Sequence, residues 1–221
     1  MKTKSKALKA LLVALCAVLL VVGSVMGTLA YLIDSQEVVN TFTVGDVDIE
    51  VDEAPVNPDG TPIEGEDRVE GNEYHLIPGQ TYTKDPTMTV KKGSEESYIR
   101  MMVNINCISE LRAIFGADFL PHEFIEGKDS NIWIYESTTE NSDNSVTYEF
   151  RYYKTVDAFE ATEDIVLEPL FTSFTIPGEM TGEELATIAD LEIRVEGHAI
   201  QTVGFADDDA AWAAFDAQMS K

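Results

Sequence analysis

The chain has little of the two residue types that most often supply cross-links or metal ligands. Two cysteines, Cys16 and Cys107, and three histidines occur among 221 residues. Cys16 lies inside an apolar run, so Cys107 is alone in the rest of the chain and a disulfide framework is excluded. Leu15 precedes Cys16 where a lipid-carrying cysteine would follow a small residue, and the apolar run continues past it. Lipidation is therefore not expected.

Basic side chains are also scarce. Fifteen lysines and arginines stand against 40 aspartates and glutamates, a formal net charge of −25. Four of the lysines and none of the acids precede Ala30, so the rest of the chain has 11 basic and 40 acidic residues, a net charge of −29. Such a surface repels nucleic acid and anionic lipid. It suits solubility, or the binding of cations or basic partners.

The N-terminus combines four lysines at residues 2–9 with an uncharged run at residues 10–33. The run is long enough to cross a bilayer, and it also fits a signal peptide. Thr28 and Ala30 are the small residues that a signal peptidase needs, which predicts a cut before Tyr31. With or without cleavage, the lysines stay on the cytoplasmic side of the membrane and the acidic part of the chain is exported. We therefore expect a signal peptide at residues 1–30 and contact with the membrane only before cleavage.

Alternation with a period of two dominates after residue 44. Val47, Ile49 and Val51 alternate with acidic residues, as is typical of a strand with one buried and one wet face. Residues 98–105, 131–136, 146–154, 168–178 and 191–205 show similar patterns or aromatic, β-branched runs. A polar turn is expected at residues 137–145. About eight strands predict an all-β fold, an antiparallel β-sandwich in one domain at residues 31–221.

Three short helices are expected among the strands. Ser109 can cap the first, and Thr181 with Glu184 forms a capping-box pattern in the second. Trp212 and Phe215 are the inward anchors of the third, which begins with three aspartates. The predicted helices span residues 109–120, 181–190 and 207–219. Residues 53–73, rich in proline, glycine and acids, predict an acidic, mobile loop.

Two N-terminal stretches resemble the TasA/camelysin (CalY) family, secreted proteins of Gram-positive bacteria. One is GTLAYLIDS, which looks like the family's cleavage region, and the other is an Asn-x-Phe-x-x-Gly stretch. The matching residues are Thr28, Ala30, Tyr31, Asp34, Asn40, Phe42 and Gly45. Similar stretches such as LIPGQ and PLFTSFTIP extend the resemblance over nearly the whole chain, except the loops and particularly residues 53–73. It implies a dedicated SipW-type signal peptidase cutting after Ala30, a jelly-roll-like sandwich and, as in better-known members, fibres in a biofilm matrix.

The resemblance also implies how such fibres form. Fibre-forming relatives place their mature N-terminus in the next subunit, and residues 31–44 are extended, β-prone and free of proline and glycine. The candidate donor strand contains Tyr31, Leu32, Ile33, Val38, Val39, Asn40 and Phe42. The expected partner is thus a second copy of this chain, in a secreted homopolymer at the cell surface or in the extracellular matrix. Two alternatives are a monomeric surface or adhesion module, and pairing of residues 38–51 within their own sheet.

Chemical sites are sparse, and we expect no enzyme and no cofactor. Camelysin has been classed as a metalloprotease, but Glu126 stands where a zinc-binding helix would place a second histidine after His122. A zinc protease based on His122 is the third alternative function. Calcium could use clustered carboxylates. The weak candidate ligands are Asp46, Asp48, Glu50, Asp207, Asp208 and Asp209. Neither group has the spacing of a calcium loop, and a wet strand face and a helix cap explain them without a metal.

Overall fold

Extended backbone dominates the part of the chain that the computed structural model describes, residues 46–219. All strand pairs among these residues are antiparallel, which confirms the predicted all-β class. The strands are β1 (Ile49–Asp52), β2 (Thr81–Thr83), β3 (Thr87–Val90), β4 (Ser97–Ile105), β5 (Ile125–Glu126), β6 (Trp133–Glu140), β7 (Val146–Tyr152), β8 (Ile165–Val166), β9 (Ser173–Thr175) and β10 (Ile193–Gln201). The helices are α2 (Ile108–Phe115), α3 (Gly182–Thr187) and α4 (Asp208–Met219), with a 3-10 turn η1 (Pro121–Phe124).

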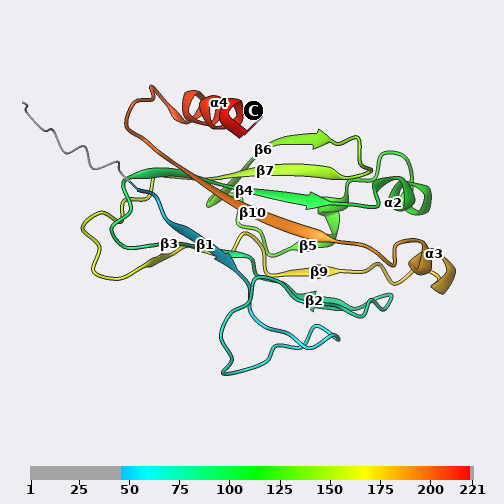
Figure 1. Cartoon of the computed structure of the whole chain (residues 1–221). Coiled ribbons are helices and arrows are strands. Elements are labelled where there is room, and N and C mark those ends of the chain that lie inside the picture. Colours follow the sequence, from blue (N-terminus) through cyan, green and yellow to red (C-terminus); the bar gives the residue numbers. More distant parts are fainter. Residues whose placement is uncertain (1–45, 220–221) are drawn as a thin grey trace, which may run out of the picture. The chain divides into compact units, whose positions relative to one another are not determined.

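The largest sheet has the strand order β10-β4-β7-β6 (Figure 1). Its inner face is apolar because alternate residues of β4, such as Met101 and Val103, are fully buried. Their register partners Phe150 and Tyr148 on β7 are buried as well. The opposite face of the same strands is polar or amphipathic, so the period-two pattern of the sequence decides which side meets the core.

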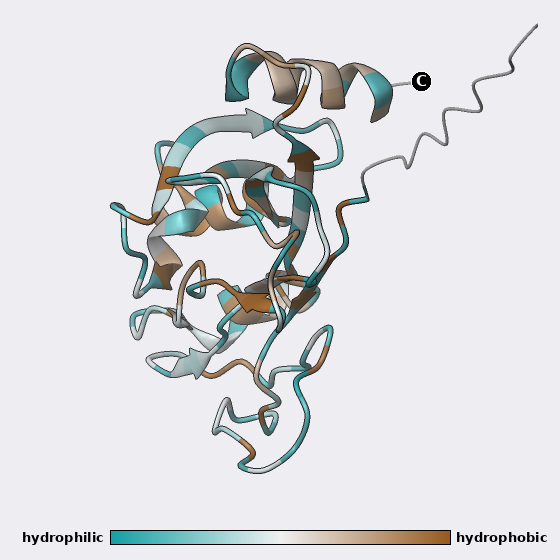
Figure 2. Cartoon of the chain, turned by 90° about the vertical axis from the view of Figure 1, so that its left-hand side faces the viewer, coloured by the Kyte–Doolittle hydropathy of each residue, from teal (hydrophilic) through white to brown (hydrophobic). Residues whose placement is uncertain are grey.

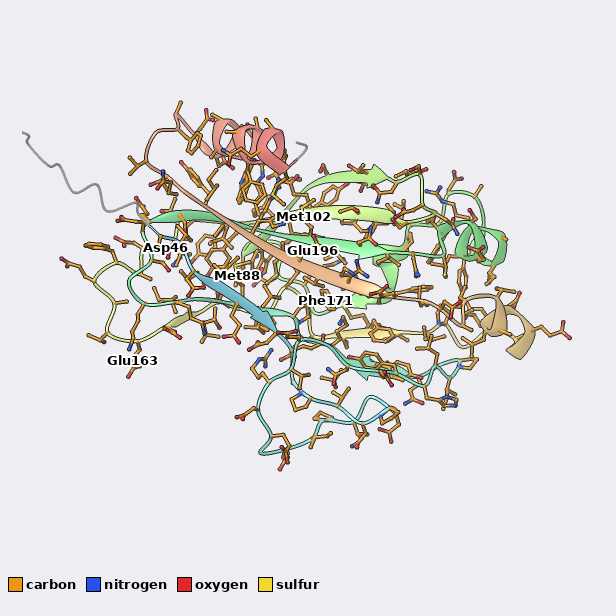
Figure 3. The ribbon with its side chains drawn as sticks, viewed as in Figure 1. Asp46, Met88, Met102, Glu163, Phe171 and Glu196 are labelled. Carbon is orange, nitrogen blue, oxygen red and sulfur yellow. The ribbon has the colours of Figure 1, made fainter. Side chains whose placement is uncertain are left out.

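A second layer is built from two three-stranded sheets, β1-β3-β8 and β2-β9-β5. Main-chain hydrogen bonds from Lys84 to Thr172 (3.2 Å) and from Leu170 to Pro86 (3.0 Å) bridge the gap between them. Residues 81–90 therefore run antiparallel to residues 165–175 along their whole length. The core lies between this layer and the four-stranded sheet, where Figure 3 labels Met88 and Phe171. Figure 2 shows hydrophobic and hydrophilic stretches alternating along the strands.

Two of the three predicted helices begin as expected. In α3, Thr181 accepts a hydrogen bond from the Glu184 N–H and the Glu184 side chain bonds back, a complete capping box. In α4, Trp212 is buried and anchors the helix. The predicted Ser109 cap of α2 is wrong, because Cys107, in a left-handed conformation, occupies the cap position. Ser109 lies inside the helix, where Asn144 accepts hydrogen bonds from its N–H and hydroxyl.

The turn between the two aromatic strands, which was predicted at residues 137–145, is shorter than expected. β6 continues through Glu140, and Ser137 to Glu140 pair with β7 after an irregularity at Tyr135–Ser137. These residues are exposed at the edge of the sheet, so their polarity reflects position and not a break in the strand. Residues 53–73 contain no helix or named strand, only turns and isolated bridges such as Glu53–Val69. Their predicted mobility stays a prediction.

The backbone of Gly197 in β10 lies close against side chains of the second layer. A Cβ atom there would overlap the side chains of Val51 on β1 and Met88 on β3. We expect Gly197→Ala to lower the free energy of unfolding by about 1–3 kcal/mol, because overpacking forces neighbouring side chains to move. Urea unfolding would measure this. Gly182→Ala, in open space at the start of α3, is the matched control and should be neutral or slightly stabilising. An equal loss in both variants would contradict close packing at Gly197.

Candidate functional site

A cavity of about 600 Å³ opens between the end of β1 and the first half of β10. Its apolar wall comes from half-buried residues on and just before β10, together with buried Phe174 on β9. Leu191, Ile193 and Val195 are among the residues on this side that line it. The opposite wall is polar and comes from the segment of residues 70–74. The close contact at Gly197 lies just beyond Val195. The cavity is therefore confined to the first half of β10.

The edge of β10 at this cavity has no strand beside it among residues 46–219. At the two ends of the β10–β4 ladder, Asn106 donates to the Glu192 carbonyl (3.4 Å) and Thr202 donates to the Glu96 carbonyl (2.9 Å). The register between them does not shift. Since successive residues of an antiparallel strand direct their N–H and C=O groups to opposite sides, those of Ile193 and Val195 point away from β4. They form an open hydrogen-bonding edge beside an apolar wall.

A buried polar network borders the other side of the cavity. The Glu53 carboxylate accepts hydrogen bonds from Lys84 Nζ (2.5 Å) and from Asn72 Nδ2 (2.9 Å). The Asn72 carboxamide is further fixed by donation to the Ala54 carbonyl (2.9 Å) and by the Val56 N–H, which donates to Oδ1 (2.9 Å). Glu53 and Lys84 are only 3% and 8% exposed. Their charges compensate each other in a place where a single charge would be costly.

Aromatic rings and an arginine hold this network in place. Tyr74 packs edge-on against Tyr82 and Phe174, and its hydroxyl donates to the Thr83 carbonyl (3.0 Å). Burial, followed by the nearby Glu53 carboxylate, raises the pKa of the Tyr74 hydroxyl, which keeps it a neutral donor. Arg68 bonds both Asp52 (2.6 Å) and Asp85 (3.0 Å), so it ties the loop to the ends of two strands. No local sequence pattern marks this arrangement, because its members are spread over more than thirty positions.

A second polar cluster fixes α4 to the outer face of the four-stranded sheet, on which Figure 3 labels Met102 and Glu196. Arg100 is 3% exposed and bonds Asp216 (2.5 Å), and its guanidinium lies 4.4 Å from the centre of the Trp212 ring. Nε of Arg100 also donates to His198 (3.2 Å). Burial and then the Arg100 charge lower the pKa of His198, while the hydrogen bond from Arg100 lowers the pKa of Asp216. Arg151 forms ion pairs with Asp208 and Asp209 at the start of α4.

The predicted calcium ligands take other roles. Glu50 pairs with Lys91, and the Asp207 carboxylate caps α4 by accepting from the Ala210 N–H (2.9 Å). Both Asp208 and Asp209 bond Arg151, at 3.0 and 2.6 Å, while Asp46 and Asp48 belong to the segment before β1. Nowhere in residues 46–219 do three or more histidine, cysteine, aspartate or glutamate side chains gather in a group that could hold a metal ion. The structure does not bring the two acidic groups together as one site.

The candidate protease stretch does not form a helix with two ligands on one face. His122 lies in the short turn η1, where its ring packs against Tyr148 at 5.0 Å, and Glu126 is exposed in β5. Cys107 is half-buried at the start of α2, and burial raises the pKa of its thiol, with Glu110 and Asp190 adding to this. A thiol whose pKa is raised is a poor nucleophile at neutral pH.

The remaining predicted residues lie outside the described part of the chain. These are the cleavage residues Thr28, Ala30, Tyr31 and Asp34 and the donor-strand residues Leu32, Ile33, Val38, Val39, Asn40 and Phe42. Residues 49–52, which follow the donor segment, form β1 and pair with β3 of the same chain. Self-pairing, the alternative considered for residues 38–51, therefore holds for residues 49–51.

No family model, curated protein or solved structure matches the chain. Within residues 46–219, none of the helices has both the length and the apolar character that a membrane crossing requires.

Proposed function

We propose that this chain is a secreted subunit of extracellular matrix fibres, with a jelly-roll-like sandwich as its folded domain. After cleavage behind Ala30, the freed segment of residues 31–44 adds as a strand to a neighbouring subunit. The observation that carries the proposal is the open edge of Ile193 and Val195 beside an apolar-lined cavity. An unpaired strand edge is a template for another chain, and main-chain hydrogen bonds would supply the affinity.

The donor and the proposed acceptor are complementary in chemistry. Residues 38–44 of the donor carry no charge, and alternate positions Val38 and Phe42 offer apolar side chains to one face. The cavity offers an apolar wall on the β10 side, where a strand added to the edge would direct every second side chain. Before cleavage the segment is joined to residues 1–30 at the membrane, so export and cleavage would license assembly.

Removal of the donor tests this proposal. We expect a chain that begins at Thr41 to fold but to remain monomeric, whereas the chain that begins at Tyr31 forms high-mass fibres. Size-exclusion chromatography and electron microscopy would measure the difference, and mass spectrometry of secreted protein would establish its N-terminus. A labelled peptide of residues 31–44 should bind the shortened chain, and a scrambled peptide of the same composition should not. Normal fibres from the shortened chain would refute donor-strand assembly, and a monomer from both chains would favour the adhesion module.

A further inference from the structure

One carboxylate, that of Glu53, holds an amine and a carboxamide at the same time. Its Oε2 atom bonds Lys84 Nζ at 2.5 Å, and its Oε1 atom bonds Asn72 Nδ2 at 2.9 Å. The two oxygens are joined through a single carbon, so the amine and the carboxamide are held side by side. Such proximity replaces a bimolecular encounter by a reaction within one site.

The carboxamide is oriented as an acyl donor. The Val56 N–H points at Asn72 Oδ1 (2.9 Å), where it would stabilise negative charge developing on that oxygen. Nδ2, the leaving nitrogen, faces the Glu53 carboxylate, which can carry a proton to it. The additional bond from Nδ2 to the Ala54 carbonyl (2.9 Å) fixes which end of the amide is oxygen and which is nitrogen.

We propose that Lys84 and Asn72 form an intramolecular isopeptide bond, with Glu53 as the proton-transfer group. Glu53 takes one proton from the Lys84 ammonium, and the free amine attacks Cγ of Asn72 to form a C–N bond. A second proton passes from Nζ through the Glu53 carboxyl group to Nδ2. The Cγ–Nδ2 bond then breaks, and the departing ammonia takes the first proton from Glu53, which restores the carboxylate. No oxidant, reductant or cofactor takes part, and the lysine charge departs as ammonium.

The surroundings keep the reacting groups away from solvent. Glu53 and Lys84 are nearly inaccessible to water, so the amine and the carboxamide meet in a site from which water is largely excluded. Tyr74 and Phe174, which pack against each other, line the cavity beside the network. The bond would close a ring over residues 72–84 and fasten the loop to the junction of β2 and β3. It needs no second subunit, so it stands apart from the proposed assembly.

Intact mass and a peptide map of the secreted protein test the proposal directly. The denatured protein should weigh about 17 Da less than its sequence requires, the mass of one ammonia. A protease that cuts after glutamate separates Asn72, on the fragment 71–73, from Lys84, on the fragment 74–95. We expect the two fragments to remain joined, which also distinguishes the cross-link from a cyclic imide at another asparagine. Full mass with a free fragment 71–73 would overturn the proposal.

Two conservative variants assign the roles. Lys84→Arg keeps the charge beside Glu53 but removes the nucleophilic amine, and Glu53→Gln keeps the shape but removes the proton carrier. Both should have full mass, and Lys84→Arg should melt at a lower temperature than the parent while keeping its circular dichroism spectrum. A parent-like mass deficit in Lys84→Arg would refute lysine as the nucleophile. If either variant fails to fold, the peptide map of the parent protein still shows whether the bond has formed.

Discussion

A Val195→Pro chain is expected to fold and yet to lose fibre assembly. The N–H of Val195 points away from β4, so proline removes no hydrogen bond within its own sheet, and proline is tolerated at such edge positions. It does remove one donor from the open edge and places a ring where an added strand would lie. The lost hydrogen bond alone weakens association by about 1 kcal/mol. Together with the steric block, we expect the fibre mass to fall about tenfold or more.

Two controls separate the backbone effect from other causes. Val195→Ala shortens the same side chain but keeps the N–H, and it should still assemble. Glu196→Pro removes an N–H that faces β4, so it should lower the stability of the subunit itself. Fibre yield by sedimentation, with urea unfolding of each monomer, would provide the measurements. Unchanged fibres from a folded Val195→Pro chain would exclude this edge as the acceptor.

The fold class was predictable because it depends on local patterns. Period-two alternation around Val103 and Val195 requires that one face of each strand be buried, whatever the rest of the chain does. The predictions that were wrong depended instead on contacts between residues distant in the sequence. Ser137 to Glu140 are polar because β6 lies at a sheet edge, and Ser109 lost its cap role because Asn144, distant in sequence, supplies the acceptor. Position in the fold decided both.

The candidate site was only half predictable. A donor segment is visible in the sequence as an extended, β-prone run without proline or glycine, but its acceptor is a gap between two layers that no local pattern marks. The Glu53–Asn72–Lys84 network is similar, since its residues lie in a loop and at a strand junction that look like ordinary polar surface. Carboxylates are so numerous in this chain that no single glutamate stands out before the fold buries it.

Arg100→Ala is expected to be among the most destabilising changes at the outer face of the sheet. Arg100 is buried, bonds Asp216 at 2.5 Å and lies over Trp212, so its loss removes a charge-assisted hydrogen bond and a cation–π contact together. It also leaves the buried Glu149 with Arg151 as its remaining ion-pair partner. We expect a loss of about 3 kcal/mol in urea unfolding. Arg194→Ala is the control, because its pair with Glu192 is exposed and screened by solvent, so its loss should change the free energy of unfolding little.

The same cluster should make the attachment of α4 sensitive to acid. The pKa of His198 is lowered from its ordinary value of 6.5, so the unfolded chain binds this proton more readily than the folded chain. Its stabilising effect is therefore complete above 6.5 and is lost as the pH falls from there toward the folded pKa. The pKa of Asp216 is also lowered, from 3.8, and that contribution disappears only in stronger acid.

Both groups act in the same direction because protonation adds positive charge at His198 and removes negative charge at Asp216, on either side of Arg100. The other charges packed around them are Glu149, Arg151, Glu196, Asp208 and Asp209. Unfolding in urea at about pH 7.5 and about pH 5.5 would measure the loss. His198→Gln cannot be protonated in this range, so its loss should be smaller than that of the parent. An equal loss would show that another group senses acid, because the sheet, the helix and their remaining charges are the same in both chains.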